Sequence, residues 1–330
     1  MTSSAVLTGL GAWLPPKIVT NDMLAERLET SDEWIRTRTG ISERHVVDGG
    51  LSTSDLAVEA GGRAMRSAGT DHVDMVILGT TTPDRACPAT APGVASRLGL
   101  TGVAAYDVSA VCSGFLYALS AGVGHIASGQ ATSVLVVAAE SFTTLLDPDD
   151  RTTAAIFGDG AGAVVIRAGS RTDPGAVLNV NLGSNGKLAD LIAVNGGGSI
   201  ERSGGVALDP YFRMQGPSVF LEAVRRMEDS ARIVVAATGW EIGEIDRLVG
   251  HQANVRILNA LTEQLGLPND AAVNNIGWVG NTAGASIPIA LADAAGEGRI
   301  RPGHKVVMTA FGGGATWGAA TLIWPDIHLV

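Results

Sequence analysis

Uninterrupted apolar runs alternate along this chain with segments of helical periodicity. Helical spacing of apolar positions predicts helices over residues 52–68 and 90–100. The apolar runs predict strands at residues 4–9, 73–79, 103–108 and 133–139. Because such continuous runs are typical of strands covered on both faces, we expect an α/β protein whose sheets lie between helices.

The pattern is less regular between residues 30 and 41. Thr30, Ser31, Asp32 and Glu33 predict a helical turn that opens with a capping box. Residues 34–41 mix aromatic, basic and small residues, and we interpret them as a turn.

The second half of the chain repeats the plan of the first. Five landmarks recur in the same order, which predicts a duplicated α/β unit with halves at residues 1–170 and 171–330. The matched pairs are residues 73–80 with 245–251, 96–100 with 263–267, the turn at Cys112 with that at 281–284, 133–139 with 305–310, and 157–166 with 311–323. Residues 170–214 are rich in Gly and Asn, and we interpret them as an inserted surface segment, either merely solvated or part of a substrate mouth.

Composition narrows the class of partner. The 330 residues are 46% hydrophobic and 17% charged, with a formal net charge of −10. An acidic chain is a poor ligand for the phosphates of nucleic acids or for an anionic membrane surface. Two cysteines, Cys87 and Cys112, and six histidines show no metal-ligand spacing, so neither a metal nor a bound cofactor is expected. The absence of a signal peptide and of a long apolar run predicts a cytoplasmic protein.

Cys112 is the first candidate for chemistry. It lies where the strand at residues 103–108 gives way to an Ala- and Gly-rich helical segment. Free N–H groups at a helix start favour an anion, which predicts a lowered pKa and a nucleophilic thiolate. A small cysteine packed in a tight turn is an equally good interpretation of this stretch alone.

Three more polar elements follow strand ends in the duplicated plan. His251 follows the strand before it, Asn281 begins the turn that matches Cys112, and a glycine turn at 312–314 follows another strand. Ligands of parallel α/β sheets gather beyond the carboxyl ends of the strands, so these residues are expected to meet. A hydrogen-bonded core histidine, an ordinary Asn cap and a tight glycine turn are the alternatives.

Together these residues suit thioester chemistry. Cys112 would accept an acyl group, while the backbone N–H groups of Cys112 and Gly313 would hold the tetrahedral oxyanion. His251 and Asn281 would donate hydrogen bonds to a second thioester carbonyl and stabilise the enolate left when a malonyl group loses CO2. Papain-like proteases also use Cys, His and Asn, but their residue order and local motifs are absent.

The motifs resemble the β-ketoacyl-acyl carrier protein synthase III family of thiolase-fold condensing enzymes. They are TSDEWIRTRTGI at 30–41, DVSAVCSG at 107–114, FGDGAG at 157–162, HQANVR at 251–256, GNT at 280–282 and AFGGGATWG at 310–318. The resemblance implies a duplicated five-layer αβαβα fold and a homodimer. It also implies Cys112, His251 and Asn281 as the catalytic residues.

The resemblance assigns further roles. Coenzyme A or its pantetheine arm would contact Trp34, Arg38, Arg151, Phe220 and Asn254, and Asn254 would also support the catalytic histidine. Phe311 would pack beside the nucleophile in the acyl pocket, and Arg256 would lie at the carrier-protein docking mouth.

Two departures from the family bear on the substrate. Cys87 stands where acetyl-preferring members carry a Phe that projects into the partner's acyl pocket, so it favours a longer or branched acyl group; a buried interface residue without effect is the alternative. Leu221, Glu263 and Gln264 replace docking lysines, which weakens attraction for an acidic carrier protein.

The leading hypothesis is therefore decarboxylative condensation of an acyl-CoA, acetyl or longer, with a malonyl thioester. The setting would be fatty-acid initiation or polyketide priming, and the two departures favour priming. An acyltransferase that moves the acyl group from Cys112 to a carrier, hydroxyl or amine is the alternative within enzymes. A non-catalytic dimer partner is the alternative outside them.

Overall fold

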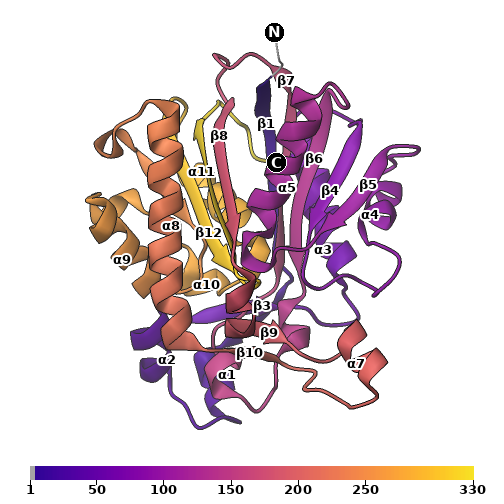
Figure 1. The fold of residues 1–330 in the computed structure, drawn as a ribbon, viewed down its shortest axis with the longest axis vertical. Helices are drawn as coiled ribbons and strands as arrows, with labels where there is room; N and C mark the ends of the chain where they lie inside the picture. Colours follow the sequence, from indigo (N-terminus) through magenta and orange to yellow (C-terminus); the bar gives the residue numbers. More distant parts are fainter. Residues whose placement is uncertain (1–3) are drawn as a thin grey trace.

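A five-stranded sheet forms the first half of the chain in this computed structural model, which describes residues 4–330 (Figure 1). Its strand order is β1-β7-β6-β4-β5, with β1–β7 and β7–β6 antiparallel and the two remaining pairs parallel. The strands are β1 (Ser4–Trp13), β4 (Met75–Gly79), β5 (Ala104–Val108), β6 (Ser133–Glu140) and β7 (Gly160–Gly169).

The strands of the second sheet, β8-β13-β12-β11, have the same order and the same relative directions as β1-β7-β6-β4 of the first sheet. Where the fifth strand would lie, a single parallel bridge joins Leu248 to Ala272. The strands are β8 (Val177–Ser184), β11 (Arg247–Gly250), β12 (Lys305–Gly312) and β13 (Thr316–Ile323). The duplication predicted from the sequence is confirmed by this matched order.

Helices form three layers around the two sheets (Figure 1). The outer layer on the first sheet is α3 (Thr53–Ser67) with α4 (Ala91–Arg97), and that on the second is α8 (Gly216–Thr238) with α9 (Val255–Leu265). Between the sheets lie α5 (Gly114–Ala127) and α11 (Ser286–Gly296). The result is the expected αβαβα sandwich.

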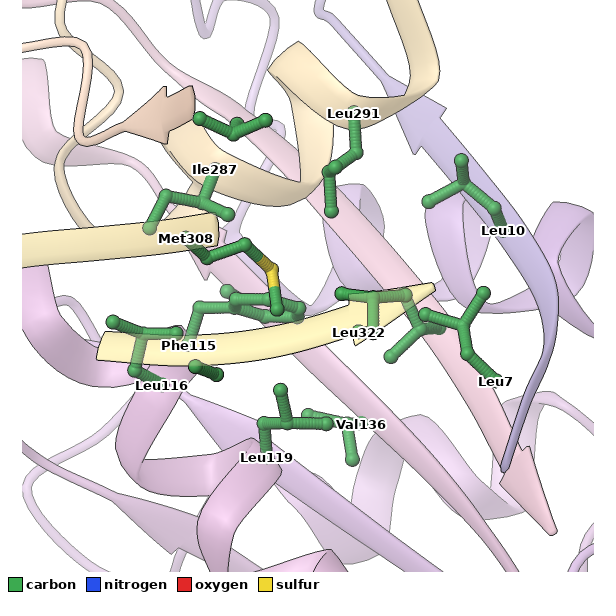
Figure 2. Packing of buried hydrophobic residues seen from close by; sticks show 14 of the residues in the cluster. Leu7, Leu10, Phe115, Leu116, Leu119, Val136, Ile287, Leu291, Met308 and Leu322 are labelled. Carbon is green, nitrogen blue, oxygen red and sulfur yellow. The ribbon is translucent and has the colours of Figure 1, made fainter. Parts of the chain in front are cut away.

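The central layer is held by the largest apolar cluster (Figure 2). Phe115 and Leu119 of α5 and Leu291 of α11 meet Met308 and Leu322 of the second sheet. The helices can be this apolar because both of their faces are covered by sheets.

The remaining elements are short and cover the carboxyl ends of the strands. They are β2 (Lys17–Thr20), α1 (Asn21–Ala25), α2 (Asp32–Thr39), β3 (Glu43–Val46), α6 (Arg151–Ala154), β9 (Ile192–Val194), α7 (Ser199–Gly204), β10 (Phe212–Met214) and α10 (Ile276–Val279). Short 3-10 turns complete the chain at Val111–Ser113, Phe142–Leu145, Gly186–Leu191, Ile242–Glu244, Asn269–Ala271 and Ala283–Ala285.

Two interpretations of the sequence need correction. The stretch taken as a turn after Glu33 is helix α2, capped by the Ser31 side chain, which accepts a hydrogen bond from the Trp34 N–H rather than forming a capping box. The segment taken as a surface insertion contributes β8, which pairs with β13 as the edge strand of the second sheet.

Two equivalent turns precede the central helices. Val111, before α5, has φ 47°, and Ala283, before α11, has φ 45°. Left-handed backbone at such residues costs about 1–3 kcal/mol each, so the surrounding contacts must hold both turns in place.

No helix in residues 4–330 combines the length and apolar character needed to cross a bilayer. Within the same residues, His, Cys, Asp and Glu side chains do not gather in threes as a metal ion would require.

Candidate active site

The Cys112 side chain lies in the 3-10 turn Val111–Ser113, between β5 and the first residue of α5, Gly114. The residue is 7% exposed. The left-handed Val111 turns the chain sharply there, so Cys112 is presented at the carboxyl end of the first sheet.

The expectation of a lowered pKa for this thiol is wrong. Burial raises the pKa of Cys112 above its ordinary value, and the negative charge of the Glu140 carboxyl raises it further. The regular turns of α5 begin only at Gly114, and a hydrogen bond from the backbone N–H of Cys112 itself offsets only part of the rise. Cys112 is therefore a neutral thiol at pH 7.

The glycine turn that ends β12 packs directly against the Cys112 turn. A Cβ atom on Gly312 would lie 2.7 Å from the Cys112 nitrogen, and one on Gly313 would lie 3.2 Å from Val111 Cγ2. The Ser113 hydroxyl donates to the carbonyl of Thr316 at 3.0 Å. Glycine is required here because the two backbones touch.

His251 is fixed by a residue that the sequence did not single out. It follows β11, is 3% exposed, and its Nδ1 lies 2.7 Å from the Ser286 hydroxyl at the start of α11. The same hydroxyl accepts the backbone N–H of Gln252 at 3.3 Å. Burial lowers the pKa of His251 to about 3, so the imidazole is neutral at physiological pH.

The hydrogen bond to Ser286 leaves the other ring nitrogen available. When the hydroxyl donates to Nδ1, the proton of the neutral ring resides on Nε2. Across residues 4–330, no side chain or backbone group is hydrogen-bonded to that Nε2. His251 can therefore act as a neutral N–H donor.

Asn281 is oriented by its own turn. Its backbone forms an isolated bridge with Phe157, in which its N–H donates to Ile156 O and its carbonyl accepts the Gly158 N–H, both at 3.0 Å. Its Oδ1 accepts the N–H of Ala283 at 2.9 Å. A backbone N–H can bond only to the oxygen of the amide, so this contact fixes which way the amide points. The Nδ2 group is left as a donor, as the predicted role requires.

The Glu140 carboxyl acts on both turns that precede the central helices, Val111–Ser113 and Ala283–Ala285. Its carboxyl is fully buried and accepts hydrogen bonds from the Thr81 N–H at 3.0 Å, the Thr82 hydroxyl at 3.1 Å and the N–H of Gly284. Burial raises the pKa of Glu140 to about 8. One carboxyl thus touches the turn after Ala283 and also acts electrostatically on Cys112.

Three aromatic rings pack in one apolar cluster with Cys112. Phe142 stacks on Phe157 with centroids 4.5 Å apart, and Phe212 meets both rings edge-on at 5.1 and 5.0 Å. Phe311 is buried in the cluster of α8 and α9, and its expected place beside the nucleophile stays a prediction. Neighbouring residues of a strand face opposite sides of the sheet, which explains how β12 can present Phe311 to that layer.

The residues expected to bind a nucleotide gather around Trp34. The guanidinium carbon of Arg38 lies 4.4 Å from the Trp34 ring centroid and that of Arg151 lies 5.3 Å away. Asn254 donates to the carbonyl of Arg38 at 3.0 Å and caps α9. The hydrogen bond to His251 comes from Ser286, so the expectation that Asn254 supports the histidine directly is not met.

The remaining expected residues are the docking and pocket positions together with Phe220, which was assigned to the coenzyme A arm. The Arg256 N–H donates to Asn254 Oδ1 at 2.8 Å, so this docking position adjoins the group around Trp34. Arg256 is exposed at the start of α9, and Leu221 is 70% exposed on α8. Phe220 is half-buried beside the α8 cluster. Cys87 is exposed in a loop of this single chain.

Ser286 and Glu140 are the functional candidates that sequence reasoning missed. Ser286 is five residues beyond Asn281 in an apolar helix, and its hydroxyl is the only polar side-chain group of the first turn of α11. Glu140 ends an otherwise apolar strand, and an acid in that place was a signal of a buried carboxyl.

Comparison with known proteins agrees with this arrangement. Residues 106–186 match the family model described as 3-oxoacyl-[acyl-carrier-protein] synthase III, and residues 235–324 match the model of its C-terminal part. The chain belongs to the β-ketoacyl-acyl carrier protein synthase III family. It is therefore an acyltransferase-type condensing enzyme.

Relatives of this synthase III family align over nearly the whole chain. β-Ketoacyl-[acyl-carrier-protein] synthase III 5 of Streptomyces coelicolor is 56% identical over 330 residues, covering 99% of each chain. The synthase III of Pseudomonas aeruginosa is 50% identical, covering 99% of this chain and 98% of its own.

Solved structures of synthase III and related enzymes have the same fold. The crystal structure of the P. aeruginosa enzyme gives a TM-score of 0.94 at 49% identity, covering 98% of this chain and 99% of that one. A priming β-ketosynthase of a polyketide pathway gives 0.92 at 30% identity, covering 98% and 97%. The thiolase-type fold expected from the motifs is confirmed.

Proposed function

We propose that the protein transfers an acyl group from acyl-CoA to Cys112 and condenses it with a malonyl thioester carried on acyl carrier protein. The observation that carries this proposal is the pair of neutral donors, His251 Nε2 and Asn281 Nδ2. Each is fixed by a hydrogen bond to its opposite atom. A site that only transferred acyl groups would have less need for two such donors.

In the first step the Cys112 sulfur attacks the acyl thioester carbon and its proton passes to the departing coenzyme A sulfur. The N–H groups of Cys112 and Gly313 receive the oxyanion, because their turns are packed together through Gly312. The rings around Phe142 then enclose the acyl chain.

In the second step the malonyl group loses CO2, and its thioester oxygen becomes the enolate oxygen. His251 and Asn281 hydrogen-bond to that oxygen. The enolate carbon attacks the acyl-Cys112 carbonyl, the carbon–sulfur bond breaks, and Cys112 takes up one proton. The products are CO2 and a β-ketoacyl thioester.

We infer a homodimer as the working form, as the family resemblance implies. Its setting would be fatty-acid initiation or polyketide priming. In the described sheet β5 is an edge strand, and Cys87 is exposed in the loop that follows β4. An edge strand of this kind is a natural place for a second copy to pair.

The test separates the two steps. Intact mass spectrometry after incubation with a panel of acyl-CoAs shows which acyl groups label Cys112, with Cys112→Ala as the blank. Malonyl-carrier protein is then added, and CO2 release is measured with the β-ketoacyl product. Labelling followed by transfer without CO2 release would replace condensation by simple acyl transfer.

A further inference from the structure

A separate cavity lies below the sheets, among the short elements at the base of Figure 1. It has a volume of about 380 Å3, within the range of about 300–1,000 Å3 typical of small-molecule sites. Its walls come from β2, α1, β3 and the segment from Thr143 to Phe157. Cys112, His251 and Trp34 are not among its lining residues.

The charged part of the lining is entirely cationic. Lys17, Arg27 and Arg44 line the cavity, and no lining residue carries a carboxylate. The buried Asp159 carboxyl lies behind the wall, where it accepts the N–H groups of Val47 and Thr143, each at 2.8 Å. Lys17 forms an ion pair with Asp48 at 3.1 Å, but both side chains are largely exposed, and such pairs are weak. Arg27 donates to the carbonyl of Pro148.

Arg44 is the most unusual of the three. It is 1% exposed, yet its hydrogen bonds go to neutral oxygens: Val19 O at 3.0 Å, Asn21 Oδ1 at 2.9 Å and Ala155 O at 2.7 Å. Its Nε has no partner among residues 4–330, and the adjacent Glu43 acts on it only through its charge. A buried guanidinium without a bonded carboxylate is an uncompensated positive charge, which a bound anion would neutralise.

Apart from Thr143, the rest of the lining is apolar. Val19, Met23, Leu24 and Val46 face the cavity together with Leu146 and Phe157. Met23 is 46% exposed at its edge, which leaves apolar surface in contact with solvent. The cavity therefore offers cations to an acidic group and apolar surface to a short chain.

We propose that this cavity binds a medium-chain carboxylate, with its acid group at Lys17, Arg27 and Arg44 and its alkyl chain on the apolar wall. Leu146 and Phe157 belong both to this wall and to the Cys112 cluster. The two sites are thus neighbours that share side chains, while their polar groups are distinct. The proposal does not depend on the condensation reaction.

The experiment is a calorimetric titration of sodium octanoate into full-length Cys112→Ala protein at low ionic strength, where charge interactions are least screened. We expect saturable binding at one site per chain. The double variant Lys17→Gln/Arg27→Gln should weaken it about 10-fold or more, since hydrogen bonds to charged groups are the stronger class. Melting temperatures measured alongside show that the exposed substitutions leave the fold intact.

Three controls decide the assignment. Arg301→Gln removes an exposed arginine that also donates to a carbonyl, that of Gly298, and should leave the affinity unchanged. Octan-1-ol should bind at least about 10-fold more weakly, because it lacks the charge. Saturating coenzyme A should not displace octanoate. Absence of saturable binding, equal affinity in the double variant, or displacement by coenzyme A would each overturn the proposal.

Discussion

The hydroxyl of Ser286 lies 2.7 Å from Nδ1 of His251 and also accepts the N–H of Gln252. With the Ser286 hydroxyl as the donor to Nδ1, the ring proton lies on Nε2, the atom proposed to bond the substrate. We predict that Ser286→Ala slows decarboxylation about 10-fold, the effect of losing roughly 1–1.5 kcal/mol of hydrogen bonding. Acylation of Cys112 should change little.

Rapid mixing of acyl-enzyme with malonyl-carrier protein, followed by CO2 detection, measures the first effect. Mass spectrometry of Cys112 labelling measures the second. Ser203→Ala, which removes an exposed serine hydroxyl that donates to Ile200 O, is the control. An equal loss in both half-reactions would mean that Ser286 serves only the general fold.

Burial is the larger cause of the raised pKa of Cys112, and Glu140 should add to it and so raise further the pH at which the thiol becomes reactive. Its negative charge raises the pKa of the thiol, so removing the charge should lower that pKa. We predict that Glu140→Gln shifts the midpoint of iodoacetamide alkylation to lower pH. The rate of alkylation is followed by mass spectrometry from pH 7 upward to the alkaline limit of the folded protein, because burial holds the pKa of this thiol above the range in which cysteine thiols ordinarily titrate. An unshifted midpoint would contradict the electrostatic coupling.

His251 should make the folded state less stable in acid. Its folded pKa, lowered to about 3, lies below that of the unfolded chain, so protons bind the unfolded chain first as the pH falls below about 6.5. Each pH unit below that value should remove up to about 1.4 kcal/mol of unfolding free energy. Urea unfolding at pH 7.5 and pH 5.5 measures the difference.

The matched variant for this pH effect is His251→Asn, which cannot take up a proton in this range. Its unfolding free energy should fall less between the two pH values than that of the native sequence. The same pH dependence in both proteins would assign the effect to other groups.

Gly312 should tolerate no side chain. A Cβ there would lie 2.7 Å from the Cys112 nitrogen and 3.0 Å from that of Ser113, both of them backbone atoms. We predict that Gly312→Ala reduces Cys112 labelling by about 100-fold or more, the cost of losing an oxyanion donor. Gly186→Ala, where a Cβ meets nothing within 4 Å, should label normally.

The three rings of Phe142, Phe157 and Phe212 should limit the length of the acyl chain bound at Cys112. Phe212 closes the cluster by contacting both Phe142 and Phe157. We predict that Phe212→Ala shifts Cys112 labelling toward longer acyl-CoAs, measured with an equimolar panel by mass spectrometry. Cys87→Phe should shift it toward acetyl-CoA. If both profiles match that of the native sequence, chain length is set elsewhere.

The sequence predicted the buried strands well because their apolar runs are continuous, as in β4 and β6. It failed at β8, whose polar Asn179 and Asn181 suggested a surface segment. In the structure these side chains are hydrogen-bonded to Thr238 and Ser230 of α8. Polar residues in a half-covered strand are compatible with burial when a neighbouring helix supplies partners.

The neighbourhood of the candidate residues was predicted for a similar reason, while their catalytic roles stay predictions. Strand ends and the repeat brought Cys112, His251 and Asn281 to one edge, which local sequence can indicate. The pKa of Cys112 depends first on burial of the thiol and then on the charge of Glu140, 28 positions further along the chain. Such long-range electrostatics follow from packing and have no local signature.

The two left-handed residues Val111 and Ala283 make Gly284 the counterpart of Cys112. A side chain on Gly284 would lie 2.9 Å from the Val111 carbonyl and 3.0 Å from a Glu140 oxygen. In the second half of the duplicated unit, the position equivalent to Cys112 therefore has no room for a side chain, because groups packed around the Cys112 turn of the first half occupy that space. On the proposed mechanism each chain carries one acyl group, because a cysteine in place of Gly284 would collide with the Val111 carbonyl and with Glu140.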